Sequence, residues 1–149
     1  MKYAPILTVA VFALSLLPGC GKSKIDQCNA FIERANQSQN VINALKLDSD
    51  DPKELEQGAA KVESEAKTLA AVELKDEKLV GFRTDYSGSL NSLAKIVHDL
   101  ATAQKDSKDP SKAKAVEAQS KKLEADADKL GKAESILIDQ INVYCTGSK

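Results

Sequence analysis

The chain has 149 residues, and its 21 Lys and Arg residues nearly balance its 22 Asp and Glu residues. This balance excludes the basic footprint that is typical of nucleic-acid-binding proteins. Tryptophan is absent and aromatic residues make up 4% of the chain, so the composition favours helices over strands. Its length indicates a single domain.

A short apolar segment opens the chain. Lys2 precedes a mostly apolar run from Tyr3 to Leu17, which at about fifteen residues is too short to cross a bilayer as a helix. A basic residue, an apolar run and small residues before a cleavage site are the layout of a secretory signal. We therefore expect residues 1–19 to be a signal peptide that is removed from the mature protein.

The signal ends in Leu17-Pro18-Gly19-Cys20, which resembles the lipobox of bacterial lipoproteins. The resemblance implies cleavage before Cys20 and a covalent lipid on its thiol. We expect no cofactor besides this lipid. It also implies a lipid-anchored, extracytoplasmic protein of the bacterial cell envelope. Gly21, in the place of a retention aspartate, favours the outer membrane. The alternative is an ordinary secretory signal cut elsewhere, which would leave Cys20 as a free thiol.

Two cysteines remain, Cys28 and Cys145. Disulfides persist outside the cytosol, and two thiols allow one intramolecular pairing. We expect this disulfide, which in the chain-entropy model would stabilise the fold by about 4–5 kcal/mol. Two reduced or separately paired cysteines are the alternative.

Four segments carry apolar residues at helical spacing, which predicts four helices packed nearly parallel to their partners. The rows are Cys28, Ala35 and Ile42; Leu55, Ala59, Val62, Ala66 and Leu69; Leu79, Tyr86, Leu93 and Leu100; and Val116, Leu123, Leu130, Leu137 and Tyr144. We assign residues 25–146 to this helical domain, residues 20–24 to a lipidated tether and residues 147–149 to a tail.

Asp-Pro pairs mark two helix starts. Asp51 precedes Pro52, with Glu54 three residues after the cap, and Asp109 precedes Pro110; aspartate at the N-cap followed by proline in the first turn is a typical start. Residues 73–78 hold neither Gly nor Pro, and their charge density alone indicates a turn. One long helix over residues 52–104 is the competing interpretation.

The cysteine pair favours an even number of helices. Four antiparallel helices, up-down-up-down, return the end of the last helix to the start of the first. Three helices would place Cys28 and Cys145 a helix length of about 35 Å apart, whereas disulfide Cα atoms lie within about 7 Å of each other. We therefore predict an all-α, up-down-up-down antiparallel four-helix bundle closed by a disulfide.

The mature chain also loosely resembles small helical lipoproteins of the myxobacterial kind, in its Cys28-Asn29 pair and its cysteine near the end. This resemblance implies no activity.

No pattern indicates catalysis or a metal site. His98 shares a polar helical row with Thr84, Asn91 and Lys105, so it is expected on the surface. The acidic runs at residues 48–51 and 124–129 lack the ligand spacing of a calcium loop, and capping and solvation explain them. We expect no catalytic residue and no metal ligand.

Two further features of the sequence have alternative interpretations. Gly81 and Gly88 lie seven residues apart on one helical face near Tyr86, which predicts either close helix packing or a groove for a small apolar ligand or partner helix. Ser38 and Gln39 lie on rows beside the core, where buried polar groups fix register between helices. The alternative for them is a hydrogen-bonding surface for a peptide or glycan.

The short tether would hold the bundle close to the membrane and place the turns at residues 46–53 and 104–111 at the far tip. These turns are our candidate contact for an envelope protein partner, through Asp48, Asp50, Asp51, Asp106 and Asp109. The sequence thus indicates a structural or adaptor lipoprotein without catalysis, and a carrier or sensor of a small apolar ligand is the alternative. It does not define the oligomeric state.

Overall fold

The computed structural model of the protein describes residues 22–147. The expected signal peptide and the candidate lipidation site Cys20 lie outside the described residues. The described part contains four α-helices, one short 3-10 helix and no strand, so the prediction of an all-helical protein with four helices is confirmed. The elements are α1 (Lys24–Asn43), α2 (Pro52–Ala70), α3 (Glu77–Asp106), η1 (Pro110–Lys112) and α4 (Ala113–Thr146).

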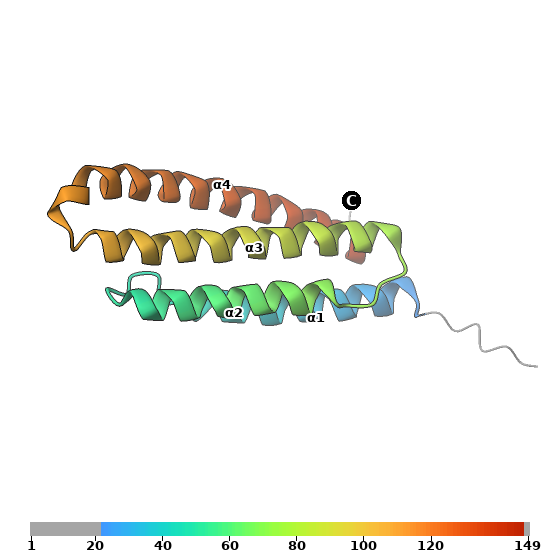
Figure 1. Ribbon diagram of the computed structural model, residues 1–149. Coiled ribbons are helices and arrows are strands. Elements are labelled where there is room, and N and C mark those ends of the chain that lie inside the picture. The colour runs from blue at the N-terminus through green and yellow to red at the C-terminus, as the bar shows by residue number, and fades with distance from the viewer. Residues whose placement is uncertain (1–21, 148–149) are drawn as a thin grey trace, which may run out of the picture.

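The four helices lie lengthwise beside one another (Figure 1). The start of α1, the loop between α2 and α3 and the end of α4 lie at one end, which we call the disulfide pole (residues 22–28, 71–78 and 143–147). The loops after α1 and α3 lie at the other end, which we call the distal tip (residues 44–51 and 107–112). α3 lies between α4 and the pair formed by α1 and α2.

Side-chain caps explain where the first three helices begin. Ser23 and Asp26 form a reciprocal capping box at the start of α1, and Asp51 accepts a hydrogen bond from the Lys53 amide at the start of α2. Asp76 accepts one from the Leu79 amide, 3.0 Å away, at the start of α3. These caps satisfy amides that have no partner within the helix.

α2 and α3 therefore form a helical hairpin. α2 ends at Ala70 and α3 begins at Glu77, so the interpretation of residues 52–104 as one long helix is wrong. The signal for the break is Asp76, an N-cap residue that the charge density of the segment conceals.

The second Asp-Pro pair acts differently from the first. Asp109 accepts a hydrogen bond from the Ser111 amide, 2.9 Å away, and starts η1 rather than α4. α4 follows at Ala113 without a side-chain cap. The expected helix start at Pro110 is thus a 3-10 turn that leads into the α-helix.

The core lies mainly between α1, α2 and α3. The whole predicted row of α2, from Leu55 to Leu69, is buried. The predicted row of α3 is buried at Leu79 and Tyr86 but only half-buried at Leu93 and Leu100. From Leu90 onward the buried residues of α3 are Leu90, Ala94, Val97, Ala101 and Ala103. A straight helix rotates a seven-residue row by about 20° per heptad, and this drift moves the later leucines to the edge of the core.

α4 is the least buried helix. It packs mainly on α3 and meets α1 only weakly. Leu123, Leu137 and Ile141 are buried, whereas Val116 and Leu130 of the predicted row are half-buried. The expectation of a continuous buried row on α4 is therefore only partly met, because one flank of the helix has no neighbour within the described residues.

Candidate functional sites

A disulfide joins the start of α1 to the end of α4. Cys28 and Cys145 are bonded, with their Cα atoms 5.7 Å apart across a sequence separation of 117 residues. The predicted pairing is confirmed. It holds the start and the end of the helical domain at one pole.

The buried amide of Gln27 ties the α2–α3 loop to the same pole. Its Oε1 accepts hydrogen bonds from the amides of Lys75 and Asp76, at 2.6 and 2.9 Å. Its Nε2 donates to the Lys22 carbonyl, 2.9 Å away. Sequence reasoning missed this residue, because a single glutamine beside an apolar row carries no signal of the distant loop that it binds.

Tyr144 connects α4 to the start of α3. Its hydroxyl donates to the Asp76 carboxylate, 2.9 Å from Oδ2. The pKa of Asp76 is lowered, first by the hydrogen bond from the Leu79 amide and then by the one from Tyr144. The Lys24 Nζ lies 3.7 Å above the centre of the Tyr144 ring, an arrangement that attracts the cation to the ring face.

An open groove follows the α3–α4 contact from the disulfide pole. It has a volume of about 520 Å³ and is lined by Lys78, Phe82, Ile136, Asp139, Gln140, Val143 and Tyr144. Phe82 and Tyr144 meet edge to face with ring centres 5.8 Å apart, and the Lys78 Nζ lies 5.1 Å from the centre of the Phe82 ring. Ile136 is 59% and Val143 is 55% exposed. We call this the α3–α4 groove.

A polar layer crosses the middle of the molecule between α1, α3 and α4. The buried Tyr86 donates its hydroxyl proton to Gln39 Oε1, 3.1 Å away. Glu134 of α4 lies beside Tyr86, and its Oε1 is buried without a hydrogen-bond partner among residues 22–147. Burial raises the pKa of Glu134. Burial, and then the Glu134 carboxylate, raises the pKa of Tyr86.

The polar residues Ser38 and Gln39, which we expect beside the core, form hydrogen bonds to neighbouring helices. Ser38 is buried and donates to Glu65 Oε2 of α2, 3.1 Å away, and Glu65 also forms an ion pair with Arg34. Gln39 accepts from Tyr86. These contacts support the interpretation that the side chains set the register of α1 against its neighbours.

The structure separates the three residues that the sequence grouped into a groove. Gly81 and Gly88 are exposed, and a Cβ built on either would meet no atom within 4 Å. Tyr86 points into the core instead and lines a small cavity of about 80 Å³, well below the ~300 Å³ or more of a typical ligand pocket. The expected close approach of a helix at these glycines is therefore wrong.

Another glycine makes the close approach. A Cβ on Gly58 of α2 would lie 3.2 Å from Cδ2 of Leu45. Gly58 therefore lets the loop after α1 approach α2. The pattern along α2 does not indicate this contact, because Leu45 belongs to a different segment.

The distal tip contains the carboxylates that were considered for a partner contact. Asp51 and Asp109 cap their helices, and Asp106 forms an ion pair with Lys112 at 2.6 Å. Asp48 and Asp50 are exposed. The Gln104 amide donates to the Ser49 carbonyl, 2.7 Å away, so the two turns that were expected at this tip are linked through the end of α3.

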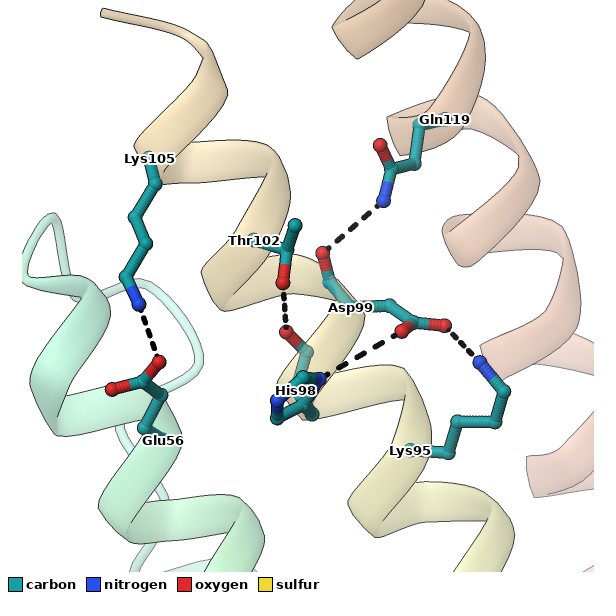
Figure 2. A network of polar contacts seen from close by, with 7 residues as sticks. All are labelled: Glu56, Lys95, His98, Asp99, Thr102, Lys105 and Gln119. Atoms are coloured by element: carbon teal, nitrogen blue, oxygen red, sulfur yellow. Dashed lines mark hydrogen bonds and ion pairs between the residues drawn. The ribbon is translucent and has the colours of Figure 1, made fainter.

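His98 is exposed on α3, as expected (Figure 2). Its Nδ1 lies 3.9 Å from the carboxylate of Asp99, which pairs with Lys95 at 2.5 Å. A separate ion pair joins Lys105 of α3 to Glu56 of α2 at 2.5 Å. These are solvated contacts that contribute little to stability.

Within residues 22–147, no group of three or more His, Cys, Asp and Glu side chains is placed to hold a metal ion. In the same part of the chain, no helix combines the length and the apolar character that crossing a bilayer requires. Comparison of the chain with protein families, curated proteins and solved structures found no match.

Proposed function

We propose that this chain is a lipid-anchored, extracytoplasmic lipoprotein of the bacterial cell envelope with a structural or adaptor role and no catalysis. Its helices would form an up-down-up-down antiparallel bundle. The observation that carries the proposal is the Cys28–Cys145 disulfide. This bond holds both ends of the helical domain at one pole, and the lipobox-like Cys20 lies only three residues before Ser23, the N-cap of α1.

The anchor would then lie next to the folded domain. Three residues span about 10 Å when fully extended, so the disulfide pole would stay near the surface that holds the lipid. One acyl chain anchors a protein only marginally, while more than one gives stable attachment. A lipid with several chains on Cys20, as the lipobox resemblance implies, would provide that attachment. The outer membrane is the favoured location because Gly21 follows.

The adaptor role is supported by the position of the distal tip. A domain anchored at the disulfide pole would present the opposite end, with Asp48 and Asp50 exposed, to the surrounding compartment. Exposed carboxylates suit a partner with a basic surface, and an envelope protein is the partner class that we propose.

A carrier or sensor of a small apolar ligand is the second candidate. The observation that favours it is the α3–α4 groove, whose volume of about 520 Å³ lies within the ~300–1,000 Å³ range of ligand pockets. The groove is open along its length, however, and the cavity at Tyr86 is small. The adaptor role is therefore the better-supported proposal.

Fractionation of the native host or a lipidating bacterial host tests the anchor. The wild-type protein should sediment with membranes, and its intact mass should exceed that of the chain from Cys20 onward by the mass of the lipid. The Cys20→Ser variant should be released into the soluble fraction or keep its signal peptide. Wild-type protein that is soluble and has an unmodified Cys20 would contradict the proposal.

The role itself needs a second experiment. Crosslinking in intact cells should capture an envelope protein with the wild-type chain, and the Asp48→Lys, Asp50→Lys double variant should lose that product. Glu124→Lys, an exposed charge reversal in the middle of α4, is the matched control. If only lipid or another apolar molecule accompanies the protein, and the tip variant behaves as the control does, the carrier role replaces the adaptor role.

A further inference from the structure

Two exposed apolar side chains, Ile136 and Val143, lie on one flank of α4 near the disulfide pole, and Ile25 of α1, which is 69% exposed, lies at the same pole. Ile136 and Val143 are both more than half exposed and lie at the edge of the α3–α4 groove. The two residues are seven positions apart, so they share a helical face and lie about 10 Å apart along the axis. Apolar side chains at the rim of an open groove form a surface that suits contact with another apolar surface.

The same flank is close to the point where the chain leads to Cys20. Val143 is two residues before Cys145, which is bonded to Cys28 of the first helix. Lys24, the first residue of α1, lies over the ring of Tyr144, which itself lines the groove. The groove therefore begins beside the start of α1, and Cys20 is four residues before Lys24 in the chain.

The charges at the disulfide pole nearly balance. They are Lys22, Lys24, Lys75 and Lys78 against Asp26, Glu73, Asp76 and Glu77, and the adjoining α3–α4 groove adds Asp139. Attraction to an anionic surface is therefore not the driving force at this pole. The ammonium groups of Lys24 and Lys78 instead lie over the aromatic rings of the groove, and long lysine side chains can place an apolar stem along an apolar boundary while the ammonium group reaches water.

We propose that the domain leans on the bilayer that holds the Cys20 lipid, with its α3–α4 flank against the membrane. Ile136, Val143 and the rim of the α3–α4 groove lie in the boundary between headgroups and acyl chains. This inference rests on the proposed lipid anchor and adds the orientation of the domain. Apolar side chains at such a boundary are buried about 5–10 Å deep, and an upright domain would bring Val143 but not Ile136 to that depth.

Tryptophan fluorescence tests the orientation, because the chain has no tryptophan of its own. The test variants are Ile136→Trp and Val143→Trp. Ile138→Trp is the matched control: it is two residues away on the same helix and 38% exposed, but it lies toward α1 at the small cavity. Leu47→Trp, 46% exposed at the distal tip, is the second control.

Each lipidated full-length variant is placed in vesicles of phosphatidylcholine with brominated acyl chains, after its disulfide and helix content have been checked. Tryptophan at positions 136 and 143 should emit at shorter wavelength and be quenched several-fold more strongly by bromine than tryptophan at 138 and 47. Raising the salt concentration should leave the difference unchanged, because the contact is apolar.

Flotation of the same vesicles separates the two proposals. If the variants float but tryptophan at positions 136 and 143 is quenched no more than tryptophan at 138, the lipid anchor is supported and the proposed contact of the α4 flank with the bilayer is wrong. A blue shift at 136 and 143 that depends on protein concentration but not on brominated lipid would assign the flank to a second copy of the chain, which also overturns the lean. If the lipidated protein does not float, both proposals fail.

Discussion

α2 and α4 both pack along α3, yet their burial differs. α2 has 19 residues, and its apolar row at spacings of three and four is buried from end to end. α4 has 34 residues, and three of its side chains are buried. α2 lies against both α1 and α3, whereas α4 packs mainly on α3. The burial of an apolar row on a helix thus depends on how many neighbouring helices contact it. The regularity of the row itself does not decide it.

The contrast has consequences for stability. Burial of apolar area is the main stabilising contribution to a fold, so α2 and α3 should form the most stable part of the protein. α4 is held at one end by the Cys28–Cys145 disulfide and at the other by the turn through η1. We expect α4 to open more readily than the rest of the molecule.

Removing the disulfide should have the largest effect on the difference in stability between α4 and α2. The Cys28→Ser, Cys145→Ser double variant should lose about 4–5 kcal/mol of unfolding free energy, the chain-entropy value for a loop of this length. Urea unfolding measures the loss, and hydrogen exchange should show α4 losing protection before α2. Equal loss of protection in both helices would mean that α4 is no less stable than the hairpin.

Truncating one apolar side chain on each helix should show the same contrast. Leu69 of α2 is fully buried, so Leu69→Ala should cost about 2–5 kcal/mol of unfolding free energy. Ile136→Ala on the exposed flank of α4 should change it by less than about 0.5 kcal/mol. Denaturant unfolding of the two variants is the measurement, and similar costs would contradict the burial difference.

Removing the hydrogen bonds that Gln27 accepts at the disulfide pole should have an intermediate effect on the unfolding free energy. Gln27→Ala leaves the amides of Lys75 and Asp76 without their acceptor, which should cost about 1–3 kcal/mol. Gln57→Ala, at an exposed position of α2, is the control and should change little. Thermal and urea unfolding measure both variants, and equal stabilities would show that water replaces the Gln27 side chain without cost.

The smallest expected effect concerns pH and Glu134. Its pKa is raised by burial, so ionisation destabilises the folded state above that pKa, and the penalty disappears as pH falls below the unfolded value of 4.5. Glu134→Gln should therefore raise the unfolding free energy near neutral pH by about 1 kcal/mol, and the gain should vanish in acid. A gain of the same size at every pH would exclude ionisation as its cause.

Much of the local structure follows from residues close in the sequence. Asp51 with Pro52, and the row from Leu55 to Leu69, predicted the start and the buried face of α2, because capping and amphipathic burial act within a few turns of helix. The cysteine pair likewise predicted the disulfide and the four helices. Asp76, by contrast, was overlooked as the cap of α3.

The amino-acid sequence by itself determined the four helices, the Asp51 cap of α2 and the pairing of Cys28 with Cys145. Tertiary structure alone decided that Gln27 and Tyr144 bind the α2–α3 loop and that Gly58 rather than Gly81 or Gly88 makes a close approach. It also decided that one flank of α4 is left uncovered by the rest of residues 22–147. The physical reason is that periodicity reports which face of a helix is apolar. How many neighbours cover that face depends on segments that are distant in the chain.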